Sequence, residues 1–497
     1  MNRTVFRTAM LGAIGILGAC APAATTGAGG VRFDRSVMPP AGAAPEYDFP
    51  DVQSHTLSNG LRVWLVERPG VPLVTVQLLV DAGAVTDPEG RSGLASLTAA
   101  MLTEGTTRRS ATQIADEIDF LAANLNAGAG QEVASVTLST LARNLMPAMD
   151  IFTDVIANPA FAEGEWARVR DQRLVSLVQA LDQPTIIATQ QFARRVYGEA
   201  HPYGRPVQGT PESVQAISPA QLRDFHRSYY RPGNANLIVV GDVRAGEVLQ
   251  QLERALSGWQ GGAAPAVAPP AAPAPQAATR VYLIDKPGAA QSEIRIGHVG
   301  VERTHRDYFP LLVMNTILGG QFSSRINLNL REDKGYTYGA RSNFQMGRIA
   351  GPFVASAGVQ TAVTKESVVE FMRELEEIRD ARPVTEEEVE FARTSIIRRE
   401  PLTLETNAQI GNRIQELILY DLPLDYFDDH NRHIAAVNTA DVNRVAREYL
   451  QPGRFAIVIV GDRSTIEQEL RTLPYPVDIV AIEGQAEPVP QQRLPGG

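Results

Sequence analysis

The residues best suited to bind a metal are two histidines that lie three positions apart. His430 and His433 occur in the segment DDHNRH, next to Asp428 and Asp429. Histidine nitrogens and carboxylate oxygens both bind zinc, but a catalytic zinc site needs three protein ligands and one open position. No pattern of three ligands surrounds this pair. We therefore interpret the segment as the solvated polar face of a helix, and the sequence predicts no metal bound by this chain.

Other common catalytic patterns are missing from the sequence. It contains no GxSxG nucleophile elbow, no P-loop and no GxGxxG after a strand. We interpret His201, in HPYG, as a structural residue at a turn. The 497 residues carry a formal net charge of −10 without a basic stripe, so nucleic acid is excluded as a partner. These patterns leave neither a nucleophile nor a phosphate-binding site.

The first residues indicate export from the cytoplasm. Residues 1–19 combine a positive start, with Arg3 and Arg7, and an apolar core too short to remain as a bilayer-spanning helix. The core ends in LGAC, which is similar to the lipobox of bacterial lipoproteins, and Cys20 is the single cysteine. We expect signal cleavage before Cys20 and a lipid anchor in the periplasm, with Ala21 favouring the outer membrane. The alternative is an ordinary signal peptide cleaved at a nearby small residue.

The two halves of the chain carry the same series of segments. YYRPGNANLIVVGD at 229–242 matches YLQPGRFAIVIVGD at 449–462, and WLVERPG at 64–70 matches YLIDKPG at 282–288. Upstream, AISPAQLRDF and AVNTADVNRV each place a capping Ser or Thr before an amphipathic run. Repeats of this kind indicate a duplicated domain of about two hundred residues.

Strands and helices alternate within each half. Residues 73–83 and 132–142 are predicted strands, the second with apolar residues at every other position. Residues 111–124 and 144–158 are predicted helices with apolar faces at helical spacing. The predicted fold class is α+β, with two homologous domains that each place helices on one face of a mostly antiparallel sheet.

The composition places the boundaries between these parts. Residues 20–50 are rich in Ala, Gly and Pro and are a predicted tether, and residues 261–279 are a predicted Pro/Ala-rich linker. The first domain is predicted at 51–260 and the second at 280–475, followed by a tail at 476–497.

Five stretches in register resemble the M16 (pitrilysin/insulinase) zinc metallopeptidases of the two-domain M16B type. The resemblance runs from about residue 50 to 470 and preserves order and spacing. It implies a chain that forms half of a clamshell, closing with a second chain around a chamber for unfolded or short peptides. The stretches are LSNGLRVWLVE (57–67), GLASLTAAMLTEGT (93–106), NPAFAEGEWARVR (158–170), HPYGRPVQGT (201–210) and LGGQFSSRINLNLREDKGYTYG (318–339).

Active members of this family carry HxxEH on the helix that is GLASLTAAML here. Two histidines at i and i+4 share one helical face and bind Zn²⁺, while the Glu activates the metal-bound water. In this chain the histidine positions are Ser96 and Ala100, the base position is Ala99, and the downstream Glu ligand falls at Ser176. With all four positions replaced, we expect no zinc in this chain.

The second half keeps a pair of polar residues that the resemblance associates with catalysis. Arg331 and Tyr338, in LREDKGYTYG, match an Arg/Tyr pair that the zinc-less subunit of heterodimeric members supplies to the substrate carbonyl. By composition alone, the same segment is an ordinary charged surface turn. Gly319 and Gly320 resemble the start of a glycine-rich loop that contacts substrate, although a helix C-cap explains two glycines as well.

The resemblance therefore implies a non-catalytic, substrate-binding subunit of an M16B peptidase. Its partner would be a second chain that carries HxxEH and the zinc, and its substrates would be peptides. The isolated chain is expected to be inactive. The alternative is a catalytically inert peptide-binding or structural pseudoenzyme, as a homodimer or in a larger assembly. The presence of both Arg331 and Tyr338 favours the enzyme subunit, because a structural protein has no reason to keep the pair.

Overall fold

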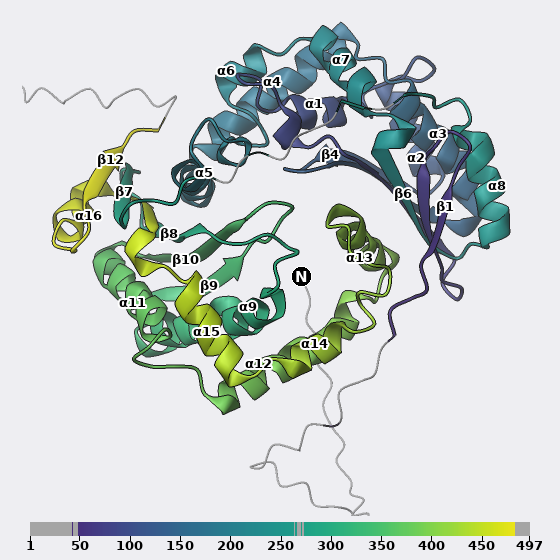
Figure 1. Ribbon diagram of the computed structural model, residues 1–497. Coiled ribbons are helices and arrows are strands. Elements are labelled where there is room, and N and C mark those ends of the chain that lie inside the picture. Colours follow the sequence, from purple (N-terminus) through teal and green to yellow (C-terminus); the bar gives the residue numbers. More distant parts are fainter. Residues whose placement is uncertain (1–41, 43–47, 263, 266–269, 271–272, 483–497) are drawn as a thin grey trace, which may run out of the picture. The chain divides into compact units, whose positions relative to one another are not determined.

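The computed structural model describes residues 42, 48–262, 264–265, 270 and 273–482 (Figure 1). The predicted signal peptide, Cys20 and most of the predicted tether lie outside the described residues, as do parts of the predicted linker and residues 483–497.

Within the described residues, the first half of the chain forms a six-stranded sheet in the order β1-β2-β6-β3-β5-β4. β2 and β6 are parallel, and the other neighbours are antiparallel. Burial alternates along β5, which confirms the predicted period-two pattern. The strands are Gln53–Thr56 (β1), Arg62–Glu67 (β2), Leu73–Val80 (β3), Asn124–Ala129 (β4), Ala134–Leu141 (β5) and Ala235–Gly241 (β6).

The second half repeats this topology. Its described sheet has the order β12-β7-β11-β8-β10-β9, so β7, β11, β8, β10 and β9 take the places of β2, β6, β3, β5 and β4. The sixth strand, β12, comes from the segment that the sequence suggested as a tail and pairs in parallel with β7. The strands are Arg280–Asp285 (β7), Gln291–Val299 (β8), Thr337–Phe344 (β9), Pro352–Gln360 (β10), Ala456–Gly461 (β11) and Val477–Val480 (β12).

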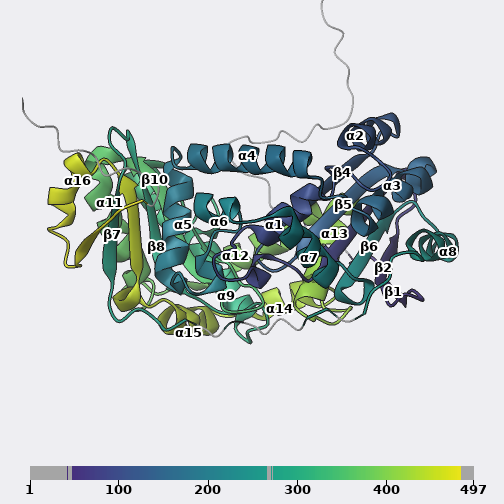
Figure 2. The same ribbon diagram turned by 90° about the horizontal axis from the view of Figure 1, so that it is seen from above.

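Helices flank both sheets (Figures 1 and 2). In the first half they are Leu94–Met101 (α1), Ala111–Phe120 (α2), Leu145–Ala157 (α3), Glu163–Ala180 (α4), Pro184–Tyr197 (α5), Pro211–Gln215 (α6), Pro219–Tyr229 (α7) and Ala245–Leu256 (α8). In the second half they are Tyr308–Asn315 (α9), Arg325–Asn327 (α10), Thr364–Glu377 (α11), Glu386–Arg399 (α12), Asn407–Leu419 (α13), His430–Ala436 (α14), Thr439–Tyr449 (α15) and Arg463–Leu470 (α16). Two π-helices, Thr316–Gly320 and Leu328–Asp333, lie between α9 and β9.

The predicted caps of the two repeated helices are only half correct. Ser218 caps α7 by accepting a hydrogen bond from the backbone N–H of Gln221. In the second repeat the cap is Asn438, which accepts from Asp441 N, and Thr439 is the first helical residue. The amide oxygen of Asn caps a helix as well as a hydroxyl does, so the repeated helix begins at the same place.

Each half places one helix on the sheet of the other half. Phe192 of α5 shares an apolar cluster with Val458 of β11. Ile410 and Ile414 of α13 share a cluster with Ile238 of β6. Neighbouring β6 residues such as Leu237 belong instead to the main core on the opposite face. The predicted helical layer on one face of each sheet is therefore present, and an exchanged helix covers the other.

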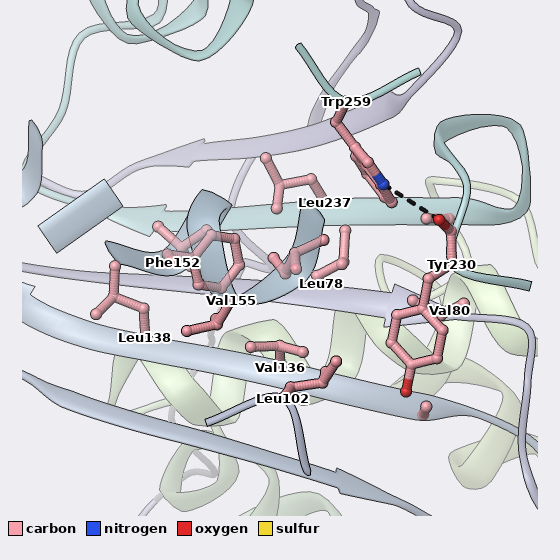
Figure 3. Packing of buried hydrophobic residues seen from close by; sticks show 14 of the residues in the cluster. Leu78, Val80, Leu102, Val136, Leu138, Phe152, Val155, Tyr230, Leu237 and Trp259 are labelled. Atoms are coloured by element: carbon pink, nitrogen blue, oxygen red, sulfur yellow. Dashed lines mark hydrogen bonds between the residues drawn. The ribbon is translucent and has the colours of Figure 1, made fainter. Parts of the chain in front are cut away.

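The core of the first half lies between its sheet and the helices α1, α3, α7 and α8. Figure 3 shows Phe152 of α3 in one cluster with Leu78 and Leu138, which lie on neighbouring strands. Trp259, just after α8, closes the core and donates from Nε1 to the carbonyl oxygen of Tyr230 at 3.1 Å. Burial of such side chains provides roughly 25 cal/mol for each Å² of apolar surface removed from water. Among the described helices, none has both the length and the apolar composition to cross a membrane.

Candidate functional site

By the M16 resemblance, α1 is the helix that would carry the zinc motif, and it is held firmly in place. Gly93 precedes it with φ +95°. The buried carboxylate of Asp87 accepts hydrogen bonds from the backbone N–H groups of Gly93 at 2.7 Å and Ala95 at 2.8 Å. Burial raises the pKa of Asp87 to about 7. The fold therefore keeps this helix as a structural element although its ligands are gone.

The position of the first zinc histidine is occupied by a hydrogen-bonded serine. Ser96 is buried, and its Oγ accepts a hydrogen bond from Arg173 Nη1 at 2.9 Å. The same guanidinium nitrogen donates to the carbonyl oxygen of Gln208 at 3.0 Å. Burial lowers the pKa of Arg173, yet arginine stays protonated in proteins. The guanidinium of Arg173, on α4, therefore lies against α1. A metal ion at this place would need anionic or neutral ligands, and a guanidinium is a cation.

The other three zinc positions offer no ligand either. Ala99 is buried and Ala100 is half-buried, and neither has a side chain that can coordinate metal. Ser176 lies on the exposed side of α4, where its hydroxyl donates to the carbonyl oxygen of Gln172 at 3.0 Å. Taken with the guanidinium of Arg173, these residues do not fit a zinc ion.

The histidine pair near the C-terminus does not form the solvated helix face that the sequence suggested. His433 is exposed, but His430 is 4% exposed and packs among aromatic rings, including Phe309 and Tyr426. The prediction was wrong for His430 because Phe309, which is distant in the sequence, packs against it together with the nearby Tyr426. Burial, with the nearby Arg413 and Arg303, lowers the pKa of His430 to about 4. No group of three His, Cys, Asp or Glu residues suited to a metal occurs in the described part of the chain.

Arg331 and Tyr338, the predicted Arg/Tyr pair, lie at one edge of the second sheet. Arg331 is in the last turn of the π-helix Leu328–Asp333, and Tyr338 is the second residue of β9. The guanidinium of Arg331 lies 4.5 Å from the ring centroid of Phe322 and pairs with Glu332 at 3.3 Å. Tyr338 is 90% exposed. Arg331 therefore lies at the end of a helix, and Tyr338 lies at the start of the next strand.

A β-bulge sets the direction of the tyrosine. Ala340 pairs with Ala357 and Thr337 pairs with Val359, so β9 places Tyr338 and Gly339 opposite the single residue Gly358 of β10. Bulges of this kind re-aim side chains and occur often beside functional sites. The hydroxyl of Thr337 fixes the bulge by donating to the carbonyl oxygen of Gly358 at 2.7 Å. The bulge therefore explains how a strand residue can be almost fully exposed.

Gly319 and Gly320 end a π-helix that rests directly on β9. A Cβ atom added at Gly319 would lie 2.3 Å from the backbone nitrogen of Ser342, closer than any real Cβ contact. Neither glycine has a positive φ, so they are not the left-handed helix cap that the sequence left open. Asn315 and Ser342 join the helix and the strand, because Ser342 Oγ donates to Asn315 Oδ1 at 2.8 Å. Close approach of two backbones is the reason for glycine here.

All four predicted residues of the second half line one groove of about 450 Å³, which we call the Arg/Tyr groove. Its lining includes Gly319, Gly320, Arg331 and Tyr338. The groove shares six residues with an adjoining cavity of about 800 Å³ that runs over the same sheet face. The shared residues are Thr185, Arg295, Gly319, Gly320, Arg341 and Ser356.

Two sequence models of one family match this chain. The model of the insulinase family, peptidase family M16, matches residues 62–209, and that of the peptidase M16 inactive domain matches residues 216–396. The chain belongs to peptidase family M16. The M16 resemblance and the two-domain sheet-and-helix fold expected from the sequence are thereby confirmed.

Several relatives resemble this M16 chain along most of its length. An uncharacterised zinc protease of Streptomyces coelicolor is 27% identical over 410 residues, covering 82% of this chain and 88% of that protein. A crystal structure of the peptidase M16 inactive domain from Pseudomonas fluorescens has a TM-score of 0.77 at 27% identity, covering 83% and 98% of the two chains. A chain of complex III₂ from Candida albicans, at 15% identity and a TM-score of 0.70, shares the fold.

Sequence reasoning missed two features of these sites. Arg173 lies one helical turn before Ser176, and its only sequence signal is a basic residue next to a position where the family has a carboxylate. The arginines Arg295 and Arg341 lie on strands and have no motif around them. The contact of Arg173 with Ser96 depends on how α1 and α4 pack. The row formed by Arg295 and Arg341 depends on how the strands of the second sheet pair.

Proposed function

We propose that this M16 chain is the non-catalytic, substrate-binding subunit of a two-chain peptidase whose other chain carries the zinc. One contrast carries the proposal. The zinc helix α1 has none of the motif's ligands and faces the guanidinium of Arg173, whereas the half-buried Arg331 and the exposed Tyr338 line a groove. A chain without any peptidase role has no use for that pair.

The roles of the two residues follow from their chemistry. A peptide laid along the Arg/Tyr groove would present a backbone carbonyl to the guanidinium of Arg331 and the hydroxyl of Tyr338. Both are hydrogen-bond donors, and they stabilise the negative charge that develops on that oxygen during hydrolysis. Phe322 supports the guanidinium by a cation–π contact. The metal-bound water and its general base belong to the partner subunit.

The proposal extends to the place where the enzyme works. The N-terminal pattern, with its single cysteine in LGAC, supports a lipoprotein anchored in the periplasm and facing peptides there. The partner subunit must then reach the same compartment. An outer-membrane anchor follows from Ala21 after the cysteine.

The test is purification of the tagged protein from its native envelope, with zinc and peptide hydrolysis measured on the eluate and on recombinant chain alone. The proposal expects zinc and activity only when a second M16 chain with HxxEH co-elutes. If the protein elutes alone, free of metal and inactive, the subunit role is wrong and an inert peptide-binding or structural role replaces it. Zinc and activity in the pure recombinant chain would equally contradict it.

A further inference from the structure

The surface that would hold substrate is positively charged, although the chain as a whole is acidic. The formal net charge is −10. The Arg/Tyr groove and the adjoining cavity together are lined by five arginines and two glutamates. The arginines are Arg295, Arg331, Arg341, Arg399 and Arg413, and the glutamates are Glu293 and Glu400. A concave surface of one sign attracts ligands of the opposite charge.

The sheet itself places two of these arginines in one row. Ser356 of β10 pairs with Arg295 of β8 on one side and with Arg341 of β9 on the other. Directly paired residues of antiparallel strands project from the same face. Arg295 is 7% exposed and is held by Glu293 at 3.0 Å and by the carbonyl oxygen of Ile294 at 2.9 Å. This arginine is therefore fixed by the protein.

Three of the five arginines have carboxylate partners. Arg295 pairs with Glu293, Arg413 with Glu400 at 2.7 Å, and Arg331 with Glu332. Arg341 and Arg399 are different, because among the described residues neither guanidinium group has a hydrogen-bond or ion-pair partner. Both are exposed and line the same cavity, Arg341 from β9 and Arg399 from the last turn of α12. Two unpaired guanidinium groups in one cavity are available to an external anion.

The polar residues between them suit a peptide. Thr185 and Thr189 of α5, Asn343 of β9 and Ser395 of α12 line the same cavity. Their hydroxyl and amide groups can donate to and accept from a peptide backbone. Arg341 also lines the Arg/Tyr groove, three positions after Tyr338 along β9. A peptide held at Tyr338 would therefore continue past Arg341.

We infer that the cavity beside the Arg/Tyr groove binds acidic segments of peptides, with Arg341 and Arg399 pairing with aspartate or glutamate side chains. This inference rests on the proposed function, because it names the class of substrate for the same groove. Arginine pairs with carboxylates through two parallel hydrogen bonds, which gives specificity as well as affinity. Arg295 also lines the site, but its ion pair with Glu293 leaves the unpaired Arg341 and Arg399 as the main source of positive charge.

The experiment measures binding of fluorescent peptides to the full-length chain. One peptide carries a run of glutamates, the second has glutamine in their place, and the third has lysine. The variant Arg341→Gln/Arg399→Gln removes the unpaired charges. The control Arg227→Gln/Arg244→Gln makes the same change in net charge at side chains that are 75% and 82% exposed on α7 and just before α8.

The inference expects the glutamate peptide to bind the wild type and the control about tenfold or more tightly than the glutamine peptide, which corresponds to about one strong charged contact. The groove variant should lose this preference, and added salt should weaken it. The melting temperature of the groove variant should not fall, since neither side chain has a partner in the part of the chain that the structure describes. A structural role for them would lower it.

Two results overturn the inference in distinguishable ways. Equal binding of all three peptides, or tighter binding of the lysine peptide, contradicts the acidic preference and leaves the peptide-binding subunit in place. Failure of every peptide to bind contradicts both the inference and the proposed function.

Discussion

Arg173 Nη1 lies 2.9 Å from Ser96 Oγ, so a cation on α4 is hydrogen-bonded to the residue at the first zinc-ligand position of α1. In a zinc peptidase the corresponding space holds a divalent cation. A guanidinium close to that space repels a metal, because two positive charges in a partly buried site interact strongly. The positions of the zinc motif therefore combine missing ligands with a nearby positive charge.

This arrangement predicts that restoring the ligands alone will not restore metal. The variant Ser96→His/Ala99→Glu/Ala100→His/Ser176→Glu should bind little zinc while Arg173 is present. Adding Arg173→Gln should raise the zinc affinity by at least about tenfold, or 1.4 kcal/mol. Competition with a chromophoric chelator measures both affinities. Equal zinc affinity of the two variants would show that the guanidinium of Arg173 does not oppose metal binding.

The backbone contact at Gly319 predicts a second effect. Gly319→Ala should lower the free energy of unfolding by about 1–3 kcal/mol, because the added methyl group meets Ser342 N at 2.3 Å and the strand must move. Gly164→Ala is the matched control, since a Cβ at this α4 residue has nothing within 4 Å. It should leave stability unchanged or raise it by a few tenths to about 1 kcal/mol. Denaturant titration of both variants measures their free energies of unfolding. Equal changes in the two variants would contradict the close packing of Gly319 on β9.

The buried His430 predicts acid sensitivity. Its pKa falls from 6.5 to about 4 in the folded chain, so the unfolded chain binds the extra proton more readily between these values. The stability that this residue contributes is complete above pH 6.5 and is lost as the pH falls towards 4, by about 2–3 kcal/mol. His430→Phe keeps an aromatic ring among Phe309 and Tyr426 and should remove this part of the pH dependence. Parallel stability curves for wild type and variant between pH 7.5 and about 4 would contradict it.

The N-terminal pattern predicts a change of compartment. Cys20→Ser should abolish lipid attachment and move the protein from the membrane fraction to the soluble fraction. Labelling with a fatty-acid analogue and fractionation of the envelope measure this. A variant that stays on the membrane and still takes up the label would show that another residue carries the anchor, and an unlabelled wild type would support the ordinary signal peptide.

The repeated architecture could be predicted because its signals are local. The Pro-Gly turns, the β6 and β11 strands and the alternating burial of β5 are all visible as short patterns in one sequence. The residues Ser96, Ala99 and Ala100 at the HxxEH positions can be read in the same way, because that motif lies within a single helix.

Features that depend on long-range packing could not be predicted. The exchange of α5 and α13 between the sheets joins residues more than a hundred positions apart, and the pairing of Arg173 with Ser96 depends on how α4 crosses α1. The burial of His430 depends on Phe309, from another helix. The bulge at Tyr338 depends on the register between two strands, and its sequence signal is only the adjacent Gly339.

The most direct test of the central claim is the turnover of the two-chain peptidase with Arg331→Ala or Tyr338→Phe in this chain. The account predicts that kcat falls by about 10²-fold for Arg331→Ala, as expected for removal of a donor to a developing oxyanion, and by less for Tyr338→Phe. Zinc content and assembly, measured by size-exclusion chromatography, should be unchanged. Arg373→Ala, on α11 outside the Arg/Tyr groove, is the control and should retain full activity. Unchanged turnover by assembled Arg331→Ala and Tyr338→Phe complexes would contradict the claim that this chain contributes to catalysis.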